Sequence, residues 1–420
     1  MFSSLSRFFK QAAVPPQYHA TFRHLYYDIA WFGVLSGSVV NFMSIYATRI
    51  GATGLQIGLI SAMSAVVNLF LAIPAGRWLK KRHTGRAIFW SSVAYRVGFI
   101  PFIFLPQLFD DAGQIVAIIV ITFLMAIPLT PLGVGFNALF AEAVPEQYRA
   151  HVAGIRNAML AVSFILTSLV SGYILNTVSF PLGYQIVFGI GAFGAAMSSY
   201  HLFFVKPLQD INPALRTDPA PDPVKPAASP RGLTSALRLD ILSTPFKRVL
   251  LAMLAFHFTH NITTPVYPLY NVRVLGLNDD HIGIGAALYY LTMLLGSMQF
   301  RRIAHRLGHK KVTGLGVAGM ALYPFLLAFS TQLWQYYAIS LIGGFTWAWT
   351  NGAYANYMLE RIPPHDRPAH LALYIIVLNI GILAGSLGGS AIATGIGLSS
   401  ALILFAILRF LAGVSILKWG

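Results

Sequence analysis

The segment KPLQDINPALRTDPAPDPVKPAASPRG, residues 206–232, separates two long apolar blocks of this 420-residue chain. Its prolines and charged side chains leave it without an apolar face to bury, which is typical of a linker. We place the linker at 206–246, between blocks at 24–205 and 247–420, after an N-terminal tail at 1–23. The chain is therefore expected to hold two large units joined by an exposed connection.

The composition of both blocks is that of a membrane protein. Hydrophobic residues make up 56% of the chain and charged residues 10%, and the mean hydropathy is +0.66, whereas soluble domains carry about 25% charged residues. Apolar runs of about 20 residues, long enough for a helix to cross the hydrocarbon core, recur through both blocks. Such unbroken runs exclude a transmembrane barrel, whose strands alternate apolar and polar residues.

Twelve candidate spans follow from these runs, six in each block. They are expected at 24–48, 55–78, 87–106, 114–140, 152–176, 182–205, 248–272, 280–300, 312–330, 334–358, 370–394 and 397–417. Short patterns also recur at equivalent places in the two blocks. The matches are Tyr46, Arg49, Gly51, Ile57 and Gly58 with Tyr270, Arg273, Gly276, Ile282 and Gly283; Glu142, Pro145, Arg149 and His151 with Glu360, Pro363, Arg367 and His370; and Gly85-Arg86 with Gly308-His309-Lys310-Lys311. The sequence thus predicts an all-α integral membrane protein of two pseudo-symmetric six-helix bundles.

The basic residues indicate the orientation of the spans. With a cytoplasmic N-terminus, the 29 Lys and Arg residues fall on the cytoplasmic side with four exceptions. Arg49 and Arg273 fall on the outer side, and Arg77 and Arg96 lie within spans. By the positive-inside rule, both termini are cytoplasmic. The net charge of +16 is then a topology signal, and we expect the lipid bilayer and no nucleic acid as a partner.

The remaining composition narrows the class of protein. The chain has no cysteine, so neither a disulfide framework nor a thiolate metal site is expected. The tail at 1–23 has no apolar core followed by a cleavage site, so we expect no signal peptide. We predict a multi-pass protein of the cytoplasmic (inner) membrane that acts as a monomer.

Twelve spans, a long linker after the sixth and two related halves resemble the plan of a major facilitator superfamily transporter. The family's motif between spans 2 and 3 joins a glycine, an acidic residue, and a basic residue followed by glycine and further basic residues. The positions that fit are Gly76, Lys81, Gly85 and Arg86 in the first copy and Arg306, Gly308 and Lys310 in the second. Lys80 and His305 occupy the acidic positions, which argues against the charge latch of other members. Ser171-Gly172 lacks the proline of the drug-antiporter subgroup, so no subfamily is assigned.

The resemblance implies that spans 1, 4, 7 and 10 line a central cavity. Each of these spans carries polar or aromatic residues at helical spacing on one face. We expect substrate binding by Trp31, Asn41, Asn137, His257, His260, Asn261, Tyr267, Trp347, Asn351 and Tyr354. The alternative is that these groups join helices across a dry interface. Pro128, Pro131, Pro265 and Pro268 predict breaks in spans 4 and 7.

Charged and titratable residues within spans are further candidates, because burying a charge is costly. Asp28 is the one carboxylate clearly inside a span, and we consider it together with His257 for proton coupling. Asp28 could instead face the membrane interface, and the two histidines of span 7 could be neutral hydrogen-bonding groups. Arg96 is interpreted as a structural charge with a partner such as Asp28, and a role in ligand binding is the alternative. A metal site is not expected, since no acidic or cysteine ligand accompanies the histidines.

These features predict a secondary active transporter of a small organic solute, working by rocker-switch alternating access, with protons as a hypothetical coupling ion. No cofactor and no enzymatic activity are expected. A uniporter and a non-transporting receptor or assembly factor of the same fold remain alternatives. The lining favours a neutral or weakly anionic solute. Leu233, Leu237 and Ile241 of the linker could form a short interfacial helix.

Overall fold

The computed structural model describes residues 14–208, 238–363 and 366–420, and these are almost entirely helical, with no strand among them. The first half contains α2 (Pro16–Leu35), a π-helical turn η1 (Ser36–Val40), α3 (Asn41–Arg49), α4 (Gly54–Lys80), α5 (Thr84–Val97), α6 (Pro101–Leu108), α7 (Asp111–Ala143), α8 (Glu146–Thr177) and α9 (Leu182–Phe203). The second half contains η3 (Leu239–Ser243), α12 (Phe246–Asn261), α13 (Val266–Leu269), η4 (Tyr270–Val274), α14 (Asp279–Met320), α15 (Leu322–Ala328), α16 (Leu333–Leu359), α17 (Arg367–Ile396) and α18 (Leu398–Trp419). The all-α prediction is confirmed.

Ten helical segments are long and apolar enough to cross a membrane. One of them, Asp279–Ala328, has 50 residues and breaks at Gly308, where φ is 77°. Gly296 before the break and Gly319 after it both lie against residues 345–348 of α16, so the two arms fold back alongside each other. The helix α16 has 27 residues but is not among the ten. The count of twelve spans stays a prediction.

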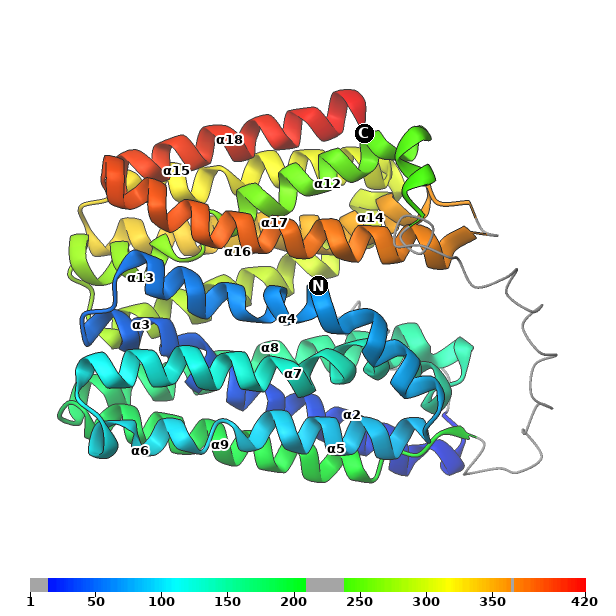
Figure 1. The fold of residues 1–420 in the computed structure, drawn as a ribbon, viewed down its shortest axis with the longest axis horizontal. Coiled ribbons are helices and arrows are strands. Elements are labelled where there is room, and N and C mark those ends of the chain that lie inside the picture. Colours follow the sequence, from blue (N-terminus) through cyan, green and yellow to red (C-terminus); the bar gives the residue numbers. More distant parts are fainter. Residues whose placement is uncertain (1–13, 209–237, 364–365) are drawn as a thin grey trace.

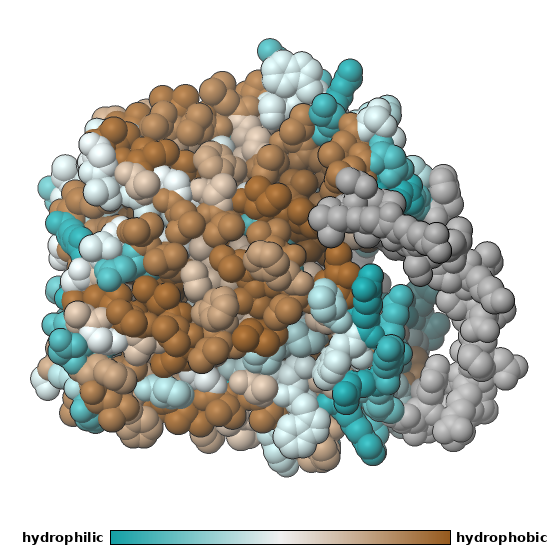
Figure 2. All heavy atoms as spheres, viewed as in Figure 1, coloured by the Kyte–Doolittle hydropathy of each residue, from teal (hydrophilic) through white to brown (hydrophobic). Residues whose placement is uncertain are grey.

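The two halves lie side by side, with the first half below and the second half above in Figure 1. We call the end that carries residues 204–208 and 238–245 the linker end, and the opposite end, with the turns at 50–53 and 275–278, the distal end. A broad apolar band separates hydrophilic residues at the two ends (Figure 2). This band is the surface expected of a protein surrounded by lipid.

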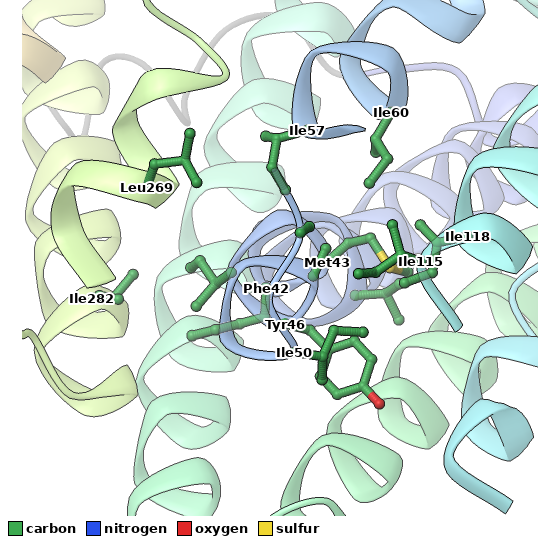
Figure 3. Packing of buried hydrophobic residues seen from close by; sticks show 14 of the residues in the cluster. Phe42, Met43, Tyr46, Ile50, Ile57, Ile60, Ile115, Ile118, Leu269 and Ile282 are labelled. Atoms are coloured by element: carbon green, nitrogen blue, oxygen red, sulfur yellow. The ribbon is translucent and has the colours of Figure 1, made fainter. Parts of the chain in front are cut away.

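Among the described residues, the core cluster that contains side chains of both halves includes the turns of the distal end. There, Phe42 and Ile57 of the first half belong to the same cluster as Leu269 and Ile282 of the second (Figure 3). Toward the linker end the described residues form two separate clusters. One contains Phe22, Leu25, Ile88, Leu139 and Leu202 of the first half, and the other Phe246, Met253, Phe256, Tyr357 and Ile416 of the second. The halves therefore pack against each other at one end and each upon itself at the other.

Two sequence predictions about local structure meet different outcomes. The helix α7 runs unbroken through Pro128 and Pro131, so the break expected in span 4 is absent. The helix of span 7 is interrupted between α12 and α13, as its prolines predicted. The expected interfacial helix lies mostly outside the described residues, while Ile241 is buried in the 3-10 turn η3.

Candidate functional site

The interruption of the seventh span leaves backbone acceptors inside the second half. Pro265 has no N–H to donate, and the N–H of Thr264 bonds to the carbonyl of Asn261 at 3.2 Å instead of continuing the α-helical pattern. The carbonyls of Thr259 and His260 are taken up by a side chain from another helix. A helix broken in this way needs a strong donor beside it.

Arg409 of α18 is that donor. Its Nη2 donates to Thr259 O at 2.7 Å and to His260 O at 3.0 Å, and its Nε donates to Thr259 O at 3.1 Å. The positive-inside pattern predicts Arg409 on the cytoplasmic side near the C-terminus, and this is wrong: the residue is 2% exposed within α18. The signal was available, because position 409 interrupts an apolar run within the span predicted at 397–417.

Two cavities meet at a wall of tyrosines. The first, of about 230 Å³, lies between the halves and includes Asn41 and Phe164 of the first half. We call it the inter-half cavity. The second, of about 270 Å³, lies inside the second half, and we call it the second-half cavity. Its lining is His260, Thr264, Tyr267, Tyr289, Met320, Tyr323, Gly343, Thr346 and Arg409. Tyr267, Tyr289 and Tyr323 line both cavities.

Several predicted site residues gather around these cavities. Asn41, His260 and Tyr267 line one or both of them. The imidazole of His260 stacks on Trp347 with ring centroids 4.8 Å apart. Tyr289 and Tyr323 come from helices that the sequence analysis had not expected to line the centre, and they were missed for that reason.

A second group of predicted residues forms a network between α12, α16 and α17. His257 Nε2 and the hydroxyl of Tyr374 lie 2.8 Å apart, and Tyr354 approaches the same imidazole edge-on at 6.0 Å. Asn261 donates to the carbonyl of His257 at 2.7 Å. None of His257, Asn261 and Tyr354 lines the two cavities.

The structure does not bring the remaining predicted residues to the cavities. The ring of Trp31 packs edge-on against Phe193 of α9, 5.5 Å away, within the first half. Asn137 of α7 and Asn351 of α16 are exposed. Their helical spacing identified a face of each helix, but spacing alone does not say what that face meets.

Asp28 is the centre of a buried charge cluster in the first half. Its carboxylate lies 3.5 Å from Arg96 and 3.4 Å from Arg156, and Ser198 donates to it at 2.6 Å. Arg156 had been assigned to the cytoplasmic side after span 4, and this was wrong: it is 7% exposed within α8. Two guanidiniums and a hydroxyl thus provide polar partners for the buried carboxylate. Asp28 is 3% exposed and does not face the membrane interface.

Polar contacts tie the halves together at the distal end. Arg49 donates to the carboxylate of Asp279 at 2.7 and 2.9 Å, and Tyr184 donates to the other oxygen of that carboxylate at 2.7 Å. Arg273, the counterpart of Arg49 in the repeat, donates to the carbonyl of Ala52 at 2.6 Å. Each of the two repeated turns thus donates hydrogen bonds to the other half, and together they hold the two halves in contact at the distal end.

The described residues include no group of three or more His, Cys, Asp or Glu side chains that could hold a metal ion. The candidate site is therefore built from aromatic, hydroxyl, imidazole and guanidinium groups around two adjoining cavities. Such a lining can bind a small molecule by shape and hydrogen bonding.

Comparison with known proteins identifies the family. The model of the Major Facilitator Superfamily matches residues 29–278 and 249–419. The chain belongs to the major facilitator superfamily. It is accordingly a multi-pass membrane transporter and not an enzyme, and the resemblance found in the sequence is confirmed.

Relatives within the major facilitator superfamily differ in what their names say they carry. The cis,cis-muconate transport protein of Acinetobacter baylyi is 25% identical over 66% of this chain and 68% of its own length. The xylose transporter XylE from E. coli, in a partially occluded inward open conformation, matches with a TM-score of 0.70 at 13% identity, over 96% of this chain and 97% of its own. A D-xylose-proton symporter matches with a TM-score of 0.67 at 14% identity, over 95% and 96%. The two structures show the shared fold alone.

Proposed function

We propose that this protein is a secondary transporter that moves a small organic solute through the inter-half cavity by alternating access. The observation that carries the proposal is the divided core: the halves share apolar packing at the distal end and separate toward the linker end. Alternating access requires a site between two halves that can be closed at one end at a time. A dry, fully packed centre would instead favour a receptor or assembly factor.

The distal contacts are suited to opening and closing. Arg49, Asp279 and Arg273 join the halves through hydrogen bonds and an ion pair, and these can exchange for water when the halves rock apart. With the linker on the cytoplasmic side, as its basic residues predict, the structure is the inward-facing state.

Coupling to protons remains part of the proposal, and His257 is the better candidate to carry one. Asp28 is engaged by two arginines and a serine in a buried cluster, which favours a structural role for it. His257 has the hydroxyl of Tyr374 as its polar side-chain partner. A uniporter would show uptake that is independent of a pH gradient, in the wild type and in His257→Gln alike.

The test uses single cysteines in a chain that has none of its own. Asn137→Cys reports an exposed position of α7, and Ala52→Cys reports the closed distal end, where Ala52 is 0% exposed. In proteoliposomes we expect a water-soluble thiol reagent to label the first and spare the second. Adding Asp279→Asn, which removes the charge that Arg49 binds, should raise labelling at 52 and lower it at 137. Labelling that responds at neither position, with no solute flux from a panel of sugars, amino acids and organic acids, would favour a non-transporting protein.

A further inference from the structure

We propose that the second-half cavity binds the carboxylate of a small organic anion, with Arg409 supplying the charge. The proposal names the substrate class for the transport function proposed above and in that sense rests on it. The binding itself is a property of one half and can be measured without transport.

The charge of Arg409 has no carboxylate partner in the part of the chain that the structure describes. Its acceptors are neutral oxygens: the carbonyls of Thr259, His260 and Met320 and the hydroxyls of Thr263 and Tyr267. The cavity lining contains no Asp or Glu. A charge that is 2% exposed is costly to bury unless an opposite charge compensates it. A bound anion would supply that compensation.

The geometry of the guanidinium leaves one nitrogen for a ligand. Nε and Nη2 are engaged by the carbonyls of the broken helix at 2.7 to 3.1 Å. Nη1 makes only two long contacts of 3.4 Å, to the hydroxyl of Tyr267 and to Met320 O, which are weaker than ordinary hydrogen bonds. The backbone therefore fixes the orientation of Arg409 and leaves Nη1 underused beside the cavity.

His260 adds a second polar atom without a partner. Its Nδ1 is buried and makes no hydrogen bond, while the parallel stack on Trp347 holds the ring in place. An unpaired buried nitrogen costs free energy that a ligand can recover. Both groups line the same cavity, so an imidazole N–H and a guanidinium N–H can donate to one carboxylate.

The tyrosines between the two cavities indicate the chemistry of the part of the ligand that is not the carboxylate. Tyr267, Tyr289 and Tyr323 separate the second-half cavity from the inter-half cavity, and the rings of Tyr267 and Tyr323 pack edge-on at 5.1 Å. Aromatic rings favour flat, unsaturated partners. We therefore infer an aromatic or unsaturated carboxylate, with its acid group beside Arg409 and its skeleton against the tyrosines of the second-half cavity.

The experiment compares carboxylates with matched uncharged amides. Purified full-length protein in detergent is titrated with benzoate, cinnamate and sorbate, and with benzamide, cinnamamide and sorbamide, by calorimetry and by thermal unfolding. We expect saturable binding of at least one acid, at least tenfold tighter than its amide. His260→Gln should weaken that binding severalfold and Arg409→Lys at least tenfold. Trp90→Phe, at an exposed position of α5 in the first half, is the control and should bind as the wild type does.

Three outcomes would overturn the inference: no binding of any of the acids, equal binding of acid and amide, or wild-type affinity in both His260→Gln and Tyr323→Leu, which removes the aromatic ring. The last pair keeps the test open if Arg409→Lys does not fold, because Arg409 also caps the broken helix. Failure here is separable from failure of the proposed function. Flux of an uncharged solute without carboxylate binding would sink this inference alone, and carboxylate binding without flux would sink alternating access alone.

Discussion

The two halves of the molecule bury arginines in opposite ways. In the first half, Arg96 and Arg156 share the carboxylate of Asp28. In the second half, Arg409 is buried as deeply, with neutral oxygens as its only described partners. Related bundles thus keep the same helices and differ in how they compensate buried charge. The difference suggests that the first half is built for rigidity and the second for binding.

The strongest test of this contrast is Asp28→Asn. Removing the carboxylate leaves two guanidiniums buried without an opposite charge, and breaking a buried ion pair in this way costs about 3–5 kcal/mol. We expect a large fall in the midpoint of thermal unfolding in detergent. Ser198→Ala, which removes one hydrogen bond to the same carboxylate, should cost about 1 kcal/mol. If both variants unfold at the same temperature, the cluster is not what stabilises the first half.

A smaller effect is expected where the broken helix of the second half is fixed from its other side. A Cβ added to Gly389 of α17 would lie 1.9 Å from the carbonyl oxygen of Ile262. Either α17 or the backbone at Ile262 must therefore move to make room for it. Gly389→Ala should destabilise the protein by about 1–3 kcal/mol, the usual cost of overpacking, and weaken any ligand bound beside Arg409. Its neighbour Gly388 has open space around it, and Gly388→Ala should change neither property. Equal behaviour of the two variants would mean that the position of the broken helix is not tightly fixed.

The smallest effect is expected for an arginine outside both bundles. Arg238 is exposed and donates to Asp240 at 2.9 Å and to Asp366 at 3.0 Å. The hydrogen bond from Arg238 to Asp240 holds the pKa of Asp240 below its usual range. The stability from this pair is therefore present above the ordinary pKa of Asp and lost as the pH falls through the lowered value. Because exposed pairs contribute little, Arg238→Ala should leave the unfolding midpoint at neutral pH nearly unchanged. A clear fall in the unfolding midpoint of Arg238→Ala would contradict this expectation and would mean that surface arginines also stabilise the protein.

Much of the fold was predictable because hydropathy acts over a whole helix. The helix Leu333–Leu359 covers the span expected at 334–358, and the helix Leu182–Phe203 covers most of the one expected at 182–205. Arg156 and Arg409 were misplaced for a related reason. A long apolar window tolerates one arginine, and the positive-inside rule assigns a basic residue near a span end to the nearest loop.

The candidate site was only partly predictable. Helical spacing identified His260 and Tyr267, because both lie on the polar face of the seventh span. A polar face is expected to point toward water or other helices and not toward lipid. Tyr289 and Tyr323 escaped notice because they lie on spans without a polar stripe. The partners of Arg409 could not be inferred from the sequence. They are backbone carbonyls of the broken helix, and the pattern of side chains does not show which carbonyls are free.

The core shared at the distal end affects the thermodynamics of the alternating access proposed above. Opening that end would separate Phe42 and Ile57 from Leu269 and Ile282, which exposes apolar surface to water, and closing the linker end would bury a different area. Exposure of apolar surface raises the heat capacity. Unless the two areas match, the equilibrium between the states has an enthalpy that changes with temperature, and a plot of its logarithm against reciprocal temperature is curved. The preferred resting state of the carrier can then reverse on warming with no change in any ligand.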